Sequence, residues 1–171
     1  MLEDEPDPNL SWRILVRLAE LGAVDADRIE RFEARRPSSQ ARTGAARALA
    51  ALPTTEAKER AWDVFSADDV DNRVFHAVGL GLWTPEQAEL SAPYVERYLD
   101  RAPVWATRRG QGFSRTIGGV FPLHAVSEAT RERLRTALDG DVPTVLRRAW
   151  NDRLDDLDLD LLVRRARRTS R

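Results

Sequence analysis

The chain has 171 residues, of which 42% are hydrophobic, enough apolar sequence for one globular domain with a sizeable core. Its 27 basic and 28 acidic side chains leave a net charge of -1, so the overall charge does not favour binding to nucleic acid or to a membrane surface. The sequence contains no cysteine, which excludes disulfides and thiolate chemistry.

The sequence shows no signal for a membrane or for secretion. The longest apolar run, residues 48–52, is far shorter than the roughly 20 residues that cross a bilayer. The first nine residues are acidic and lack the apolar stretch of a signal peptide. We therefore expect a cytoplasmic protein with a disordered or expression-derived segment at 1–6, a single domain at 7–168 and a frayed tail at 169–171.

Signals for helix starts recur along the chain, each a Ser, Thr or Asp ahead of an apolar pattern of helical period. They are Asp7, Asp25, Ser38 or Ser39, Thr54 or Thr55, Asp68 or Asp69, Ser127 and Asp141. The first helix, residues 8–21, is apolar on two faces. Such a helix is normally covered on more than one side, so we expect it to form the uncovered end of a helical array.

The stretch 83–105 carries two further helix starts close together. Residues 84–87, Thr-Pro-Glu-Gln, predict a cap, a proline in the first turn and a capping-box partner. Residues 91–93, Ser-Ala-Pro, predict a second cap directly afterwards. We expect a short helix, a tight corner and a longer helix that Pro103 kinks or restarts, followed by a short glycine-rich helix that ends at Pro122.

No segment alternates polar and apolar residues over the length of a strand. The chain therefore predicts an all-α fold of about ten helices of 8–18 residues. Short connections place successive helices as antiparallel neighbours, and the pairs recur every 25–45 residues. This pattern is typical of a HEAT-like array of helix pairs, an α-α superhelix.

The search for catalytic and metal-binding residues is negative. His76 and His124 are the only histidines, and neither belongs to an H-E-x-x-H motif or to a zinc-ligand spacing. The acidic run around Asp156 resembles a calcium loop, but Leu161 and Arg167 stand where that loop needs glycine and glutamate. We expect no catalytic residue, no metal ligand and no cofactor in this chain.

Three arginines stand out because they lie among glycines and aromatic residues. They are Arg108, Arg109 and Arg115, beside Trp105, Phe113 and Phe121. The planar fork of a guanidinium suits a carboxylate, which makes these arginines candidates for facing a peptide. The alternative interpretation is that they are ordinary surface arginines, as most charged side chains are.

Four segments resemble the C-terminal part of actinobacterial-type aminopeptidase N. Residues 51–62 (ALPTTEAKERAW) resemble its R-P-T-x-E-A-K-x-x-A-W, and residues 81–87 resemble its G-F-W-x-P-x-Q. Residues 93–98 (PYVERY) resemble P-Y-V-x-R-Y-F, and residues 7–18 resemble D-x-x-L-R-W-x-L-L-x-R-L. Leu52, Ser11 and Ile14 depart from these patterns. The matches run in order over residues 7–168.

The resemblance implies a parent enzyme that is a zinc metallopeptidase and removes single N-terminal residues from peptides. Its H-E-x-x-H helix and its G-A-M-E-N loop belong to an earlier domain and are absent here, so no catalytic residue is carried over. The C-terminal domain of this family is a HEAT-like array that limits access to the active-site cavity. The implied partners are the catalytic and upstream domains of the same polypeptide and the peptide substrate, and Met1 would begin an expressed fragment.

The sequence leaves a second function open. A stand-alone array of helical repeats can act as an adaptor that binds another protein on its concave surface. The two interpretations differ in whether the reading frame continues upstream into an H-E-x-x-H motif.

Overall fold

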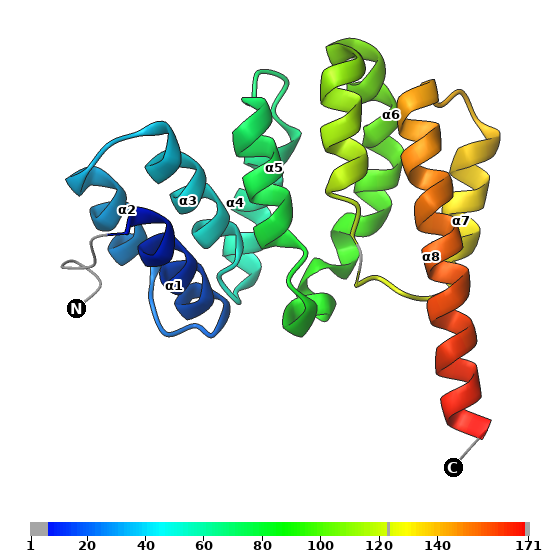
Figure 1. The fold of residues 1–171 in the computed structure, drawn as a ribbon, viewed down its shortest axis with the longest axis horizontal. Coiled ribbons are helices and arrows are strands. Elements are labelled where there is room, and N and C mark those ends of the chain that lie inside the picture. Colours follow the sequence, from blue (N-terminus) through cyan, green and yellow to red (C-terminus); the bar gives the residue numbers. More distant parts are fainter. Residues whose placement is uncertain (1–6, 123, 170–171) are drawn as a thin grey trace. The chain divides into compact units, whose positions relative to one another are not determined.

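The computed structural model describes residues 7–122 and 124–169, and the predicted all-α fold is confirmed in them (Figure 1). The disorder expected for residues 1–6 lies outside the described residues, as does all of the tail expected to fray at 169–171 except residue 169, which ends the last helix. The helices are α1 (Pro8–Glu20), α2 (Ala26–Arg35), α3 (Ser39–Ala50), α4 (Thr55–Ser66), α5 (Asn72–Leu82), α6 (Ala88–Gly119), α7 (Glu128–Asp139) and α8 (Thr144–Thr169), with a 3-10 helix, η1 (Pro85–Gln87). No described helix has an apolar stretch long enough to cross a bilayer.

The described part of the chain contains eight α-helices, so the prediction of about ten was wrong. Three expected helices between residues 84 and 122 form η1 and the single long α6 instead. The hydroxyl of Ser91 donates to the carbonyl oxygen of Gln87 at 3.2 Å instead of capping a new helix, and Pro93 and Pro103 lie inside α6. The break comes at Gly110, where φ is 78° and ψ is -178°, a conformation that is essentially restricted to glycine.

Most helix starts agree with the local signals. The caps observed at predicted positions are Asp7, Asp25, Ser38, Thr54 and Ser127. The fifth helix instead begins after Asp71, whose carboxylate accepts from the backbone N–H groups of Arg73 and Val74 at 2.9 and 3.3 Å. The prediction that Asp68 or Asp69 caps this helix was wrong. The neighbouring Val70 is buried, which holds that stretch in a turn ahead of the helix.

By its internal contacts the chain divides into two compact units, one ending at Ser91 and the other beginning at Ala92. In the first unit α3 is central, because it packs against α1, α2, α4 and α5. Alanines make the close approach possible, as expected for the small side chains of this helix. A Cβ at Gly44 of α3 would lie 2.3 Å from the ring of Trp12 in α1, so only glycine admits this contact.

Three polar side chains of the first unit bind carbonyl groups at helix ends, and we call Lys58, Thr84 and Gln87 the carbonyl clamp. Lys58 has no exposed surface, and its Nζ donates to the carbonyl oxygen of Ala50 at 2.7 Å and to that of Gly81 at 3.4 Å. These carbonyls belong to the last turns of α3 and α5, where helix dipoles place negative partial charge. A buried ammonium group therefore joins two helix C-termini.

The other two members of the clamp act on the same ends. The amide Nε2 of Gln87 donates to the carbonyl oxygens of Glu20 and Ala51, at 3.0 and 2.8 Å, which joins the C-termini of α1 and α3. The hydroxyl of Thr84 donates to the carbonyl of Gly81 at 2.8 Å and makes no cap for η1. The expected capping box at residues 84–87 is therefore a set of contacts to the C-termini of α1, α3 and α5.

In the second unit the two arms of α6 run side by side after the break at Gly110 (Figure 1). The phenol of Tyr98 in the first arm donates to the carbonyl of Ile117 in the second at 2.8 Å. The ring of Tyr98 also packs against Phe121 and Trp150, with centroid separations of 5.9 and 6.3 Å. The five tryptophans are all buried, as expected for core residues.

Candidate functional site

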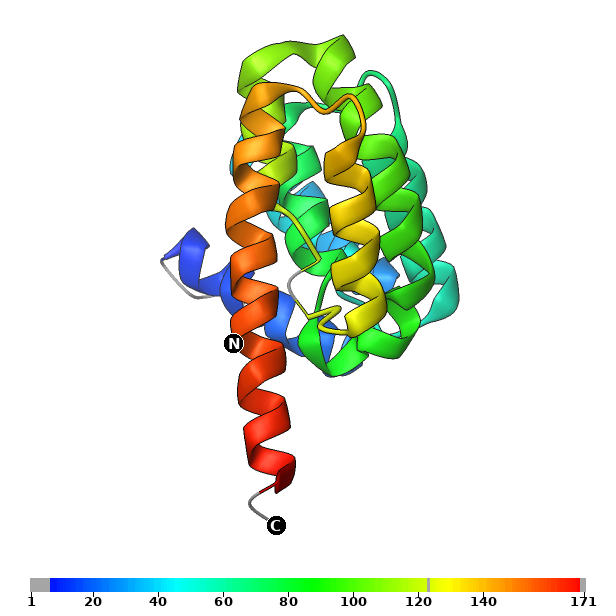
Figure 2. The same cartoon turned by 90° about the vertical axis from the view of Figure 1, so that its right-hand side faces the viewer.

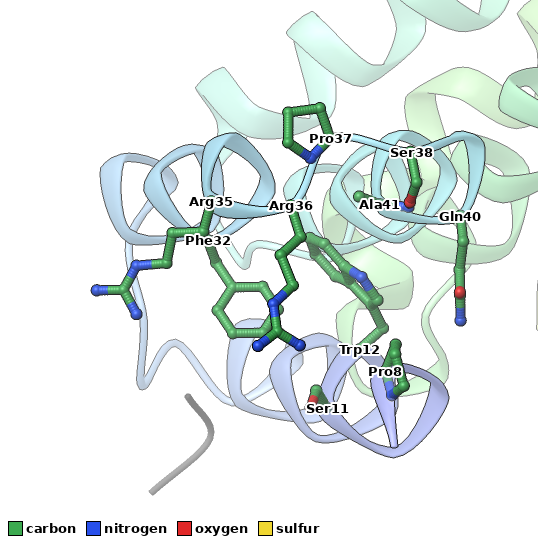
Figure 3. A pocket seen from close by; sticks show the side chains of 10 residues that line it. All are labelled: Pro8, Ser11, Trp12, Phe32, Arg35, Arg36, Pro37, Ser38, Gln40 and Ala41. Carbon is green, nitrogen blue, oxygen red and sulfur yellow. The ribbon is translucent and has the colours of Figure 1, made fainter. Parts of the chain in front are cut away.

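A small cavity opens between α1, α2 and α3 (Figure 3). Its volume is about 250 Å³, and it is lined by Pro8, Ser11, Trp12, Phe32, Arg35, Arg36, Pro37, Ser38, Gln40 and Ala41. Trp12 and Phe32 meet edge to face, with ring centroids 5.0 Å apart and planes at 86°. These two rings lie between the helices and make the inner wall apolar, while the arginines stand on the turn that leaves α2 (Figure 3).

Several polar groups around this cavity are already engaged. The hydroxyl of Ser38 accepts the N–H of Ala41 at 3.0 Å because it caps α3, and that of Ser11 donates to the Asp7 carbonyl at 3.2 Å. The residues of the described chain that line it include no Asp, Glu, His or Cys, and these are the side chains that bind hard or borderline metal ions. The cavity is suited to recognising an apolar group, with guanidinium groups at its rim, rather than to catalysis.

A wider groove of about 620 Å³ lies over α3, with walls from α2, α4 and α5. Its floor is made largely of alanines, which leave space because their side chains are short; those of α3 and α4 are Ala45, Ala46, Ala50, Ala57 and Ala61. The α2 wall is acidic, with Asp27, Glu30 and Glu33, while Arg42 and Arg60 stand on α3 and α4. An apolar floor between walls of opposite charge is a shape that fits a peptide or helix better than a small molecule.

The three arginines singled out in the sequence lie on both sides of the α6 break. Arg108 and Arg109 end the first arm and Arg115 belongs to the second. The guanidinium carbon of Arg109 lies 3.6 Å from the centre of the Phe113 ring, a cation–π contact, while Arg108 and Arg115 are exposed. None of the three lines either cavity described above, and their role toward a peptide stays a prediction.

Two groups have shifted acid–base behaviour, and both lie in the core. Burial lowers the pKa of Lys58 from 10.5 to about 8, although the nearby carboxylate of Glu20 raises it slightly. Burial raises the pKa of Tyr98 well above its ordinary value of 10, and the neighbouring Trp150 and Arg153 oppose this. Both side chains donate to backbone carbonyls, so we assign their shifts to architecture and not to chemistry.

The histidines lie apart from any cluster of ligands. His76 on α5 and His124 in the connection to α7 are both exposed. In residues 7–122 and 124–169 no group of three or more His, Asp or Glu side chains is placed to hold a metal ion.

Comparison with known proteins follows the same stretches of sequence. A family model described as the ERAP1-like C-terminal domain matches residues 2–159. An aminopeptidase N from Streptomyces lividans is 35% identical over 129 residues, which cover 74% of this chain. The aligned part is 15% of that relative, so the chain spans only a small share of the length of the curated relative that it matches.

Proposed function

The chain belongs to the family of ERAP1-like C-terminal domains, and on that premise we propose that it is a non-catalytic domain of a zinc-dependent aminopeptidase N. In this proposal it packs on the catalytic and upstream domains of the same polypeptide. It shapes and restricts the access of peptides to the active-site cavity. The parent enzyme releases N-terminal amino acids from peptides in the cytoplasm, and its zinc is held by residues outside the 171 of this chain.

The observation that supports the proposal is the family match over residues 2–159, together with 35% identity to an aminopeptidase N. The arrangement of the helices agrees with a scaffold role, because the polar side chains of the carbonyl clamp donate hydrogen bonds to carbonyl groups at helix ends. The expected single domain at 7–168, built as a HEAT-like array, is part of the same proposal.

The proposal is tested first on the chain itself. We expect the purified chain, after incubation with zinc, to release no product from an aminoacyl-anilide and to retain no stoichiometric zinc after dialysis. Hydrolysis that persists in a preparation shown to be free of contaminating aminopeptidases would overturn the non-catalytic assignment.

A second test addresses the role of the three arginines toward peptides. In the full-length enzyme, replacing Arg108, Arg109 and Arg115 together by alanine should raise KM for long peptides, since guanidinium forks that meet peptide carboxylates would be lost. The rate on a one-residue reporter substrate should be unchanged. Arg148→Ala on exposed α8 is the matched control, and equal KM values for the triple variant and the control would contradict the role.

The groove over α3 favours a second candidate function, an adaptor that binds another protein. Its apolar floor and oppositely charged walls are features of a protein-binding surface. The reading frame separates the two functions. Continuation upstream into an H-E-x-x-H motif supports the peptidase domain, whereas a gene that encodes these residues alone supports the adaptor.

A further inference from the structure

The last part of α8 carries an apolar stripe that its own unit leaves uncovered. After the buried Leu157, none of residues 158–167 of α8 is buried. Figure 2 shows this end of α8 extending beyond its neighbour α7. Leu159, Leu162 and Val163 are 60%, 62% and 40% exposed, which is a high exposure for three large apolar side chains on two turns of helix.

The spacing of these residues makes them one surface. Leu159, Leu162 and Val163 stand at i, i+3 and i+4, so they share a sector of about 100° on the helix. The buried positions Leu146, Trp150 and Leu157 point about 170° away from that sector by the same geometry.

Contacts within the unit hold the back and one flank of α8. Asp158 pairs with Arg131 and Arg135 of α7, Arg165 pairs with Glu128, and the guanidinium of Arg164 donates to the Val126 carbonyl at 3.1 Å. These pairs place the helix with its stripe facing away from α7. The match to the family ends at residue 159, the first residue of the stripe.

The charges beside the stripe identify its partner. Asp156, Asp160 and Arg167 fall on the same flank, within about 40° of one another. Asp156 also pairs with Arg153 of its own helix at 2.9 Å. When two copies pair antiparallel about a two-fold axis at Leu162 and Val163, like flanks face each other and Arg167 comes level with position 158 of the other copy. It then lies between Asp156 and Asp160 of the second copy, and symmetry makes the contact twice.

We propose that the end of α8 is a self-association surface, on which a second copy of this chain docks in antiparallel orientation. A parallel pair would place the acidic flank of one helix against Asp155 and Asp158 of the other, so like charges would meet. About two and a half turns of helix on each side bury less than a standard protein interface. The dimer is therefore weak, with dissociation in the micromolar range or above.

The experiment is sedimentation equilibrium of the chain from about 1 µM to about 500 µM, a range that covers weak association. We expect a concentration-dependent rise toward the dimer mass. Leu162→Glu should abolish it, whereas Leu21→Glu, at the equally exposed residue that follows α1 (61%), should leave it unchanged. Far-UV circular dichroism checks that both variants keep the helical content of the parent chain.

Charge exchange tests the orientation. Arg167→Glu and Asp160→Arg alone should each weaken the dimer about tenfold, because each breaks symmetric ion pairs between the copies and brings like charges together. The double variant should recover most of the loss. A monomer over the whole concentration range would overturn the proposal. The proposal would also be overturned if Leu21→Glu lost the dimer while Leu162→Glu kept it. The same holds if the double variant dimerised as weakly as the single variants.

Discussion

Lys58 is the only lysine of the chain, and its side chain is completely buried. A lysine in a helix flanked by charged residues would normally be read as a surface residue, since ammonium groups are rarely buried without a partner. Here the partners are the carbonyl groups of Ala50 and Gly81. The residue therefore acts as part of the core, and its contribution is open to measurement.

Lys58→Met should lower the free energy of unfolding by about 1–3 kcal/mol, because it removes the buried donor to the Ala50 carbonyl, while the Gly81 carbonyl keeps its bond from the Thr84 hydroxyl. The methionine fills a similar volume, so the loss reports the hydrogen bonds rather than a cavity. The measurement is urea unfolding followed by tryptophan fluorescence, with Glu59→Met at the adjacent exposed position as the control. A variant as stable as the parent would show that the clamp contributes nothing.

The pKa of Lys58 predicts how stability depends on pH. Its pKa is about 8 in the folded chain and 10.5 when exposed, so the unfolded state binds more protons between these values. Stability should therefore rise with pH across that window, by at most about 3 kcal/mol. Urea unfolding at intervals of pH measures this, and the rise should be missing in Lys58→Met.

Ionisation of Tyr98 should end the rise in stability at high pH. Its pKa is raised in the folded chain, so above pH 10 the unfolded state loses the phenolic proton while the folded state keeps it. Stability should fall as the pH increases through that region. Tyr98→Phe should remove the fall and leave the Lys58 window intact. An unchanged fall in this variant would point to another group.

Among the helices, α6 is the element whose course depends most on a single backbone position. Its two arms meet at Gly110, whose dihedral angles suit glycine alone. No atom lies within 4 Å of the place where a Cβ of residue 110 would stand. The cost of a side chain there is therefore a backbone cost without a steric clash.

Gly110→Ala should destabilise the chain by about 1–3 kcal/mol through this backbone strain. Gly112 offers a matched control, since a Cβ there also meets nothing but the residue lies within the second arm. Gly112→Ala should leave stability unchanged or raise it by up to about 1 kcal/mol. Thermal unfolding by circular dichroism compares them, and equal midpoints would argue against strain at the break.

Local signals predicted most helix starts, but they failed where tertiary contacts determine whether a helix begins or continues. Asp25, Ser38 and Thr54 cap helices because their side chains satisfy nearby N–H groups, a purely local effect. Ser91 and Pro93 carry the same local signal, yet α6 continues through them. Sequence spacing identifies a cap candidate and does not show whether the chain turns there.

The candidate sites were less accessible to prediction than the fold. The cavity in Figure 3 combines Trp12, Phe32 and Gln40 from three helices, so it exists only after packing. The burial of Lys58 had one signal in the sequence, since the apolar Ala57 and Ala61 place it beside the buried face of α4. The arginines were found in the sequence from their glycine and aromatic neighbours, and the structure adds one such contact, that of Arg109 with Phe113.

At the scale of the whole molecule, the chain passes from its first compact unit to its second inside α6. Because helix formation is cooperative, we expect residues 7–168 to unfold in one transition. Lys58→Met in the first unit and Gly118→Ala in the second should lower the same midpoint. A Cβ at Gly118 would lie 2.4 Å from that of Ala149, an overpacking that costs about 1–3 kcal/mol. If the midpoints measured by fluorescence and by circular dichroism differ in either variant, the two units unfold as independent domains.

The burial of Lys58 also gives the chain a built-in reporter. Apart from the amino terminus, its ε-amino group is the only primary amine in the sequence, and it has no exposed surface. An acylating reagent can therefore modify Lys58 only in molecules in which the ends of α3 and α5 have separated. The rate of modification at this one site, followed by mass spectrometry, then measures how often the centre of the first unit opens.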